Sequence, residues 1–158
     1  MKPIGVIGVG NPLRQDDGIG IYLLEKLRDQ FSSTGGPFEF IDGGTAGFSL
    51  IHVLSRFDTV VIIDAVNFHG TPGELRMFTA QQARSVKTCN DLSTHHTDLF
   101  QILDIVDRLD TKPSHLLIIG IQPQSIEYGT TLSSALQQVV DDYIQIITTH
   151  LESLRTSQ

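Results

Sequence analysis

The chain has 158 residues, of which 40% are hydrophobic, and its formal net charge is −7 at pH 7. These values predict one globular domain, residues 1–158, large enough to bury its own core. The negative charge argues against a nucleic-acid partner, since phosphate contacts need a basic surface. The single cysteine, Cys89, excludes an internal disulfide and a thiolate cage for zinc, and it suits a reducing compartment. No apolar run approaches the roughly 20 residues that span a bilayer, and a strand pattern begins at Pro3, so we expect a cytoplasmic protein with no signal peptide and no membrane partner.

The first predicted elements enclose a glycine-rich loop. Residues 3–7 form an apolar run typical of a buried strand, and a helical pattern begins at Ile19. Between them lie glycines, a proline and the adjacent acids Asp16 and Asp17. A loop that leaves the carboxyl end of a central strand lies over the crevice where open α/β sheets bind ligands. One aspartate is enough to cap a helix. The second aspartate of the pair can therefore have a functional role.

The rest of the chain alternates between strand and helix patterns. Strands are expected at residues 38–41, 59–63, 74–78 and 115–121, and helices at residues 48–54, 79–84, 99–109 and 132–154. Residues 85–97 show no periodic pattern. The alternation predicts an α/β fold, a three-layer α/β/α sandwich whose five-stranded sheet is mostly parallel. Residues 74–78 alternate in hydrophobicity and are expected to be its one antiparallel edge strand.

Acidic residues follow three of the predicted strands. Asp16 and Asp17 come after the first strand, Asp42 after the second and Asp64 after the third. Because the carboxyl ends of parallel strands meet at one edge of a sheet, these carboxylates can converge. Clustered carboxylates repel one another, and a cation or a shared proton is the usual compensation.

The irregular stretch adds His95 and His96, and imidazole commonly joins carboxylates in sites for zinc or nickel. Of this pair, one ligand at most is expected. Structural interpretations stay open beside these roles: Asp64 can cap a turn, Asp42 precedes two glycines as turn formers do, and Thr94 can cap the following helix.

Several catalytic signatures are absent. The sequence has no His-Glu-x-x-His motif and no Gly-x-Ser-x-Gly motif. The Gly8-Val9-Gly10 loop carries Leu13 where a dinucleotide-binding loop has its third glycine, and the acids beyond it would repel a pyrophosphate. A nucleotide-binding α/β module is therefore a weaker hypothesis.

Taken together, the motifs resemble those of the nickel–iron hydrogenase maturation proteases. The resemblance covers nearly the whole chain. It rests on Gly8-Val-Gly-Asn11, Asp16-Asp-Gly-Ile-Gly20, Asp42-Gly-Gly-Thr-Ala-Gly47, Asp64-Ala65, Ser93-Thr-His95 and Gly120-Ile-Gln-Pro123 with Glu127.

The resemblance implies an endopeptidase that removes the C-terminal extension of a nickel-loaded hydrogenase large-subunit precursor. Nickel arrives with the substrate and serves as the recognition signal, and zinc or cadmium can replace it in a crystal. The metal-contacting positions of the family correspond to Asp17, Asp64 and His95, with His96 as the neighbouring alternative. A non-enzymatic, nickel-dependent assembly chaperone would use the same three ligands and is the alternative function.

The catalytic residues implied in this way are Asp16, Asp17 and Asp42. Asp42 matches a position regarded as important for cleavage, and the general base is open between Asp16 and Asp42. Small residues and polar groups of the two glycine-rich loops would let a substrate backbone approach closely. The predicted substrate-binding residues are Gly10, Asn11, Gly43, Gly44 and Thr45.

Overall fold

The computed structural model describes residues 2–88 and 94–157, and the side chains of residues 84, 86–88 and 94–98 lie outside that description. Its centre is a five-stranded sheet with the strand order β2-β1-β3-β5-β4. The strands are β1 (Ile4–Gly8), β2 (Phe38–Asp42), β3 (Thr59–Ala65), β4 (Leu75–Thr79) and β5 (His115–Ile121). Strands β1, β2, β3 and β5 are parallel, and β4 pairs with β5 in the antiparallel direction at one edge. The predicted sheet and its antiparallel edge strand are confirmed.

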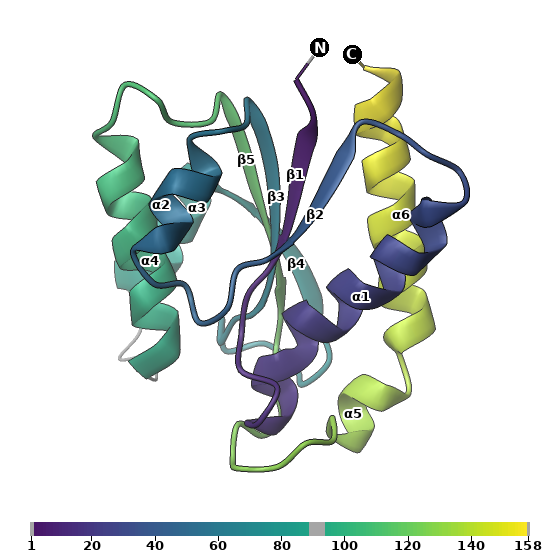
Figure 1. The fold of residues 1–158 in the computed structure, drawn as a ribbon. Helices are drawn as coiled ribbons and strands as arrows, with labels where there is room; N and C mark the ends of the chain where they lie inside the picture. The colour runs from purple at the N-terminus through teal and green to yellow at the C-terminus, as the bar shows by residue number, and fades with distance from the viewer. Residues whose placement is uncertain (1, 89–93, 158) are drawn as a thin grey trace.

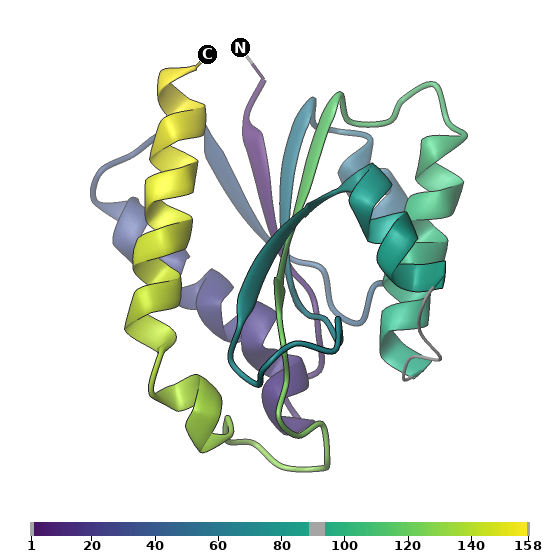
Figure 2. The ribbon, with the colours of Figure 1, turned by 180° about the vertical axis from the view of Figure 1, so that it is seen from behind.

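Helices cover both faces of this sheet. They are η1 (Gln15–Gly18), α1 (Ile19–Ser32), α2 (Ser49–Leu54), α3 (Ala80–Thr88), α4 (Thr94–Asp107), α5 (Ser134–Gln137) and α6 (Val140–Thr156). Helices α1, α5 and α6 lie on one face, and α2, α3 and α4 lie on the other (Figures 1 and 2). The predicted three-layer sandwich is therefore correct. No helix within the described ranges is long and apolar enough to cross a membrane.

The central strands are buried on both sides, which explains their continuous apolar sequences. Ile7 and Ile62 pack into the cluster beneath α2 and α4, whereas Val6 and Val61 pack into the cluster beneath α1 and α6. Successive residues of a strand point to opposite faces, so each strand contributes to both clusters. The two clusters fix the sheet between its helical layers.

Three helical predictions differ from the structure. The helix expected over residues 132–154 is divided into α5 and α6. Its apolar pattern continued across the break because Leu136 of α5 and Val140 of α6 pack into the same cluster. Helix α4 begins at Thr94 instead of residue 99, since its first turn consists of polar residues that give no hydrophobic signal. Helix α3 likewise extends to Thr88, beyond the expected residues 79–84.

The parallel strands place the loops that follow them at one edge of the sheet. In Figure 1 these strands run downward, and the loops after β1, β3 and β5 lie at the bottom of the view. The two termini lie together at the opposite edge (Figure 1). Asp17, Asp42 and Asp64 belong to the lower edge, as the sequence predicted.

Tyr143 connects α6 to the loop before β4 by donating a hydrogen bond to the carbonyl oxygen of Gly73. Burial, followed by the negative charges of Asp16 and Asp142, raises the pKa of Tyr143 from 10.0 to about 12. The folded protein therefore favours the protonated phenol. Its contribution to stability is complete below pH 10, the pKa in the unfolded chain, and is lost as the pH rises to 12.

We expect Tyr143→Phe to lower the free energy of unfolding at pH 7 by about 1 kcal/mol, because the Gly73 carbonyl loses its donor. This difference between the two proteins should shrink between pH 10 and 12, where the wild-type phenol ionises. Urea unfolding of both proteins from pH 7 to 12 measures it. A difference that stays constant over this range would contradict the shifted pKa.

Candidate active site

The loop after β1 folds back onto η1 and buries Asp17. Gly10 has a φ of 141°, and a Cβ at this position would lie 1.8 Å from the carbonyl oxygen of Asp17. A side chain there is therefore incompatible with this approach, which explains the glycine. The backbone N–H of Asn11 donates to Oδ2 of Asp17 at an N···O distance of 3.0 Å. Asp17 is 2% exposed and is oriented by the loop that covers it.

Asp64 lies at the carboxyl end of β3 and is 3% exposed. Asp17 and Asp64 line the same small cavity, together with Val9, Gly10 and Thr45. The cavity holds about 10 Å³, close to the smallest space that accepts one water molecule. Two carboxylates around one cavity repel each other unless a cation or a proton compensates them. The predicted convergence of Asp17 and Asp64 is observed, and their roles as metal ligands stay predictions.

The loop after β2 packs against the loop after β1. The N–H of Gly43 donates to the carbonyl of Gly8, and the N–H of Gly10 donates to the carbonyl of Gly44, both at 2.8 Å. This pairing places Thr45 at the cavity. Of the five predicted substrate-binding residues, Gly10 and Thr45 line the cavity, while the other three belong to the loops that frame it.

Asp42 ends β2 and is exposed. Its Oδ1 accepts a hydrogen bond from the N–H of Gly44 at 2.8 Å, the geometry of an aspartate that stabilises its own turn. Asp42 is not among the residues that line the cavity. Its exposed carboxylate remains accessible to a water molecule, so a role as general base stays a prediction.

Asp16 points away from its neighbour Asp17 and into the protein. It is fully buried, and its carboxylate accepts three backbone hydrogen bonds from the loop after β5. The donors are the N–H groups of Gln124 at 2.8 Å, Ser125 at 3.1 Å and Ser133 at 2.7 Å. These contacts favour an anchoring role, and the catalytic role predicted for Asp16 stays a prediction.

The histidines predicted as ligands lie at the start of α4, in its first turn. This end of α4 lies towards the loop edge of the sheet (Figure 1). The side chains of His95 and His96 lie outside the described residues, so the predicted third ligand and the choice between the two are untested. Among the side chains that are described, no group of three or more His, Cys, Asp or Glu is placed to hold a metal ion.

Gln122 is a site-organising residue that sequence reasoning missed. It is 7% exposed, and its Oε1 accepts hydrogen bonds from the N–H groups of Phe68 at 2.9 Å and Gly70 at 3.0 Å. Its Nε2 donates to Oδ1 of Asn67 at 3.1 Å. Gln122 thereby ties the loop after β3 to the loop after β5. Its position directly after the predicted strand 115–121 could have identified it, because Asp64 was identified by the same position after the strand 59–63.

Known proteins share this fold and resemble this sequence over most of its length. A family model described as "Hydrogenase maturation protease" matches residues 21–150. The "Hydrogenase 2 maturation protease" of Escherichia coli K12 is 28% identical over 153 residues, which are 96% of this chain and 90% of that protein. The "Hydrogenase expression/formation protein HupD" of Thiocapsa roseopersicina is 27% identical over 147 residues, and the match covers 92% of this chain and 66% of that protein. The structure of the hydrogenase maturating endopeptidase HybD from E. coli superposes with a TM-score of 0.81 at 26% identity, covering 96% of this chain and 93% of that one.

Proposed function

Because the chain belongs to the hydrogenase maturation protease family, we propose that it is the endopeptidase that removes the C-terminal extension of a nickel–iron hydrogenase large-subunit precursor. The precursor is both the substrate and the protein partner. A cytoplasmic location is part of this proposal, since a single cysteine suits a reducing compartment.

The observation that carries the proposal is the shared cavity of Asp17 and Asp64 at the loop edge of the sheet. Two buried carboxylates beside a space for one small ligand form a site for a cation. Nickel held by the precursor would enter this site as part of the substrate, with Asp17 and Asp64 as oxygen ligands and His95 as the nitrogen ligand. Recognition would then depend on nickel, because an empty precursor lacks the charge that the two carboxylates need.

Hydrolysis requires a water molecule beside the scissile carbonyl. The water oxygen forms a bond to the carbonyl carbon, the C–N bond breaks, and the departing amine gains the proton that the water has given to the general base. In our proposal Asp42 accepts the proton from the water, because its carboxylate is exposed whereas that of Asp16 is fully buried. The glycines of the loop after β2 leave room for the substrate backbone, since a Cβ at Gly44 or Gly47 would meet nothing within 4 Å.

The proposal is tested by incubating a large-subunit precursor, with and without nickel, and measuring its mass. We expect a loss of mass confined to the C-terminus, and only in the nickel-loaded sample. Equal shortening of both samples would retain the protease and remove the nickel dependence. Stable binding without any loss of mass would contradict the endopeptidase and favour an assembly chaperone that uses the same ligands.

A further inference from the structure

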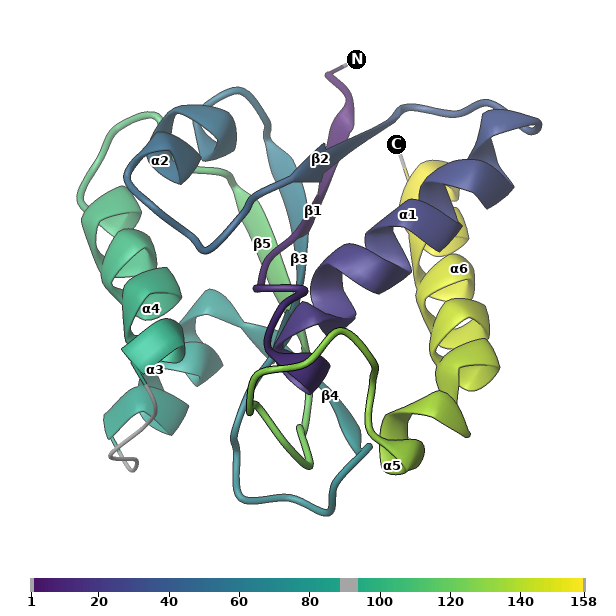
Figure 3. The same cartoon turned by 60° about the horizontal axis from the view of Figure 1, so that its bottom comes forward.

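Two loops at the edge of the site are joined into one rigid unit. The loops after β1 and β5 run side by side below the sheet (Figure 3). The N–H of Gly129 donates to the carbonyl of Leu13 at 2.9 Å, and the N–H of Gln15 donates to the carbonyl of Gly129 at 3.0 Å. Nε of Arg14 donates to the carbonyl of Ile126 at 3.1 Å. We call residues 13–15 and 126–129 the paired-loop platform.

Asp16 holds this platform through further hydrogen bonds. Its N–H donates to the carbonyl of Ser125 at 3.1 Å, and its carboxylate binds three further N–H groups of the same loop. Hydrogen bonds to a buried charged group are stronger than those between neutral groups. The platform is therefore fixed to η1, the segment that also carries Asp17.

Large apolar side chains project from the platform into solvent. Tyr128 is 87% exposed and Leu13 is 62% exposed. The guanidinium of Arg14 lies 5.6 Å from the centroid of the Tyr128 ring and supports it from one side. Because hydrogen bonds already order the backbone of the platform, binding costs mainly the rotamer freedom of these side chains, and tyrosine is among the residue types enriched at interface hot spots.

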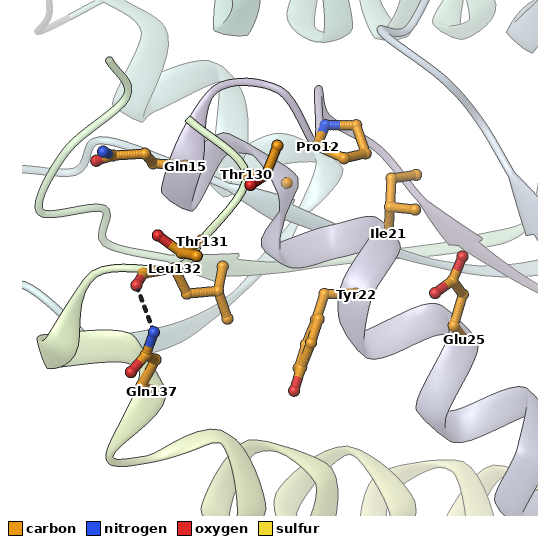
Figure 4. A pocket seen from close by; sticks show the side chains of 10 residues that line it. Pro12, Gln15, Ile21, Tyr22, Glu25, Thr130, Thr131, Leu132 and Gln137 are labelled. Atoms are coloured by element: carbon orange, nitrogen blue, oxygen red, sulfur yellow. Dashed lines mark hydrogen bonds between the residues drawn. The ribbon is translucent and has the colours of Figure 1, made fainter. Parts of the chain in front are cut away.

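A groove of about 380 Å³ borders the platform. Its walls come from the start of α1, with Ile21 and Tyr22, and from residues 130–132 after the platform (Figure 4). Gln15 of the platform and the neighbouring Pro12 also line the groove. The platform thus combines projecting side chains with a neighbouring groove. A partner protein of complementary shape can pack against both.

We propose that the paired-loop platform and this groove bind an apolar surface of the precursor protein, with Leu13 and Tyr128 as the anchors. The inference rests on the proposed function, since it takes the partner from there. The platform begins two residues before η1, the segment that carries Asp17, so a folded precursor that presents its peptide bond to the cavity of Asp17 would also reach the platform. The anchors carry no charge, so the surface that receives them is apolar.

The test is the double variant Leu13→Ala/Tyr128→Ala, assayed on the nickel-loaded precursor. We expect KM to rise at least about tenfold, as for truncation of interface anchors, while kcat stays within about twofold. Ile146→Ala is the matched control, because Ile146 is 43% exposed on α6 and lies outside the platform and groove, and it should leave KM unchanged. An unchanged KM in the double variant overturns the proposal, and so does a fall in kcat alone.

Failure of the proposed function is distinguishable from failure of the platform. If the wild-type protein does not shorten the precursor, the protease assignment fails, and the platform is judged from binding alone. Isothermal titration of the precursor into wild-type and double-variant protein then measures the dissociation constant. A dissociation constant at least about tenfold weaker for the double variant supports the platform, and equal constants overturn it.

Discussion

Replacing Asp17 or Asp64 by asparagine is expected to stop shortening of the nickel-loaded precursor, with a loss of rate of about three orders of magnitude. Both carboxylates are buried around one cavity, so removal of either charge weakens the site for a cation. Loss of one group that acts on the reacting atoms has effects of this size in other enzymes. A mass assay of the precursor over time measures the remaining rate.

Asparagine keeps the shape of the side chain and, at position 17, an oxygen that accepts the N–H of Asn11. The variants should therefore unfold at urea concentrations close to that of the wild-type protein. Asp29→Asn is the control, because Asp29 is exposed on α1 and outside the cavity, and it should cleave at the wild-type rate. Cleavage near the wild-type rate by both site variants would contradict the assignment of the site.

The sheet and the convergence of Asp17 and Asp64 were accessible from sequence because both follow from local patterns. Residues 59–63 are all β-branched, which predicts a strand buried on both faces, and β3 occupies this position. The carboxyl ends of parallel strands share one edge, so an acid after each strand predicts a common site. Asp17 and Asp64 meet there although they are far apart in the sequence.

The orientation of each acid could not be predicted in the same way. Asp16 and Asp17 are adjacent and identical in type, yet one faces the cavity and the other faces the loop after β5. The partners of Asp16 are backbone N–H groups more than 100 positions away in the chain, and every residue type except proline supplies such a group. No side-chain pattern marks them, so the sequence could identify the pair of acids but not their separate roles.

Asp16→Ala should cause the largest loss of stability among the acids of the site. The substitution leaves three backbone N–H groups of the loop after β5 without their acceptor. Donors left unsatisfied inside a protein cost about 1–3 kcal/mol each, so we expect the free energy of unfolding to fall by at least about 3 kcal/mol. The melting temperature should fall by about 10 °C. Asp42→Ala is the matched control, because its exposed carboxylate accepts one N–H and its loss should cost less than about 1 kcal/mol.

The conservative variant Asp16→Asn separates an anchor from a base. Asparagine has one acceptor oxygen, and its NH₂ group faces backbone donors, so the loop is loosened while most of the side-chain volume remains. An anchoring Asp16 predicts a higher KM for the precursor, because the paired-loop platform loses its brace, with kcat largely retained. A catalytic base predicts the reverse, a loss of kcat at unchanged KM. The three hydrogen bonds of Asp16 favour the first outcome. The two adjacent acids would then have different roles, with Asp17 at the reaction cavity and Asp16 as the anchor of the loop that binds the substrate.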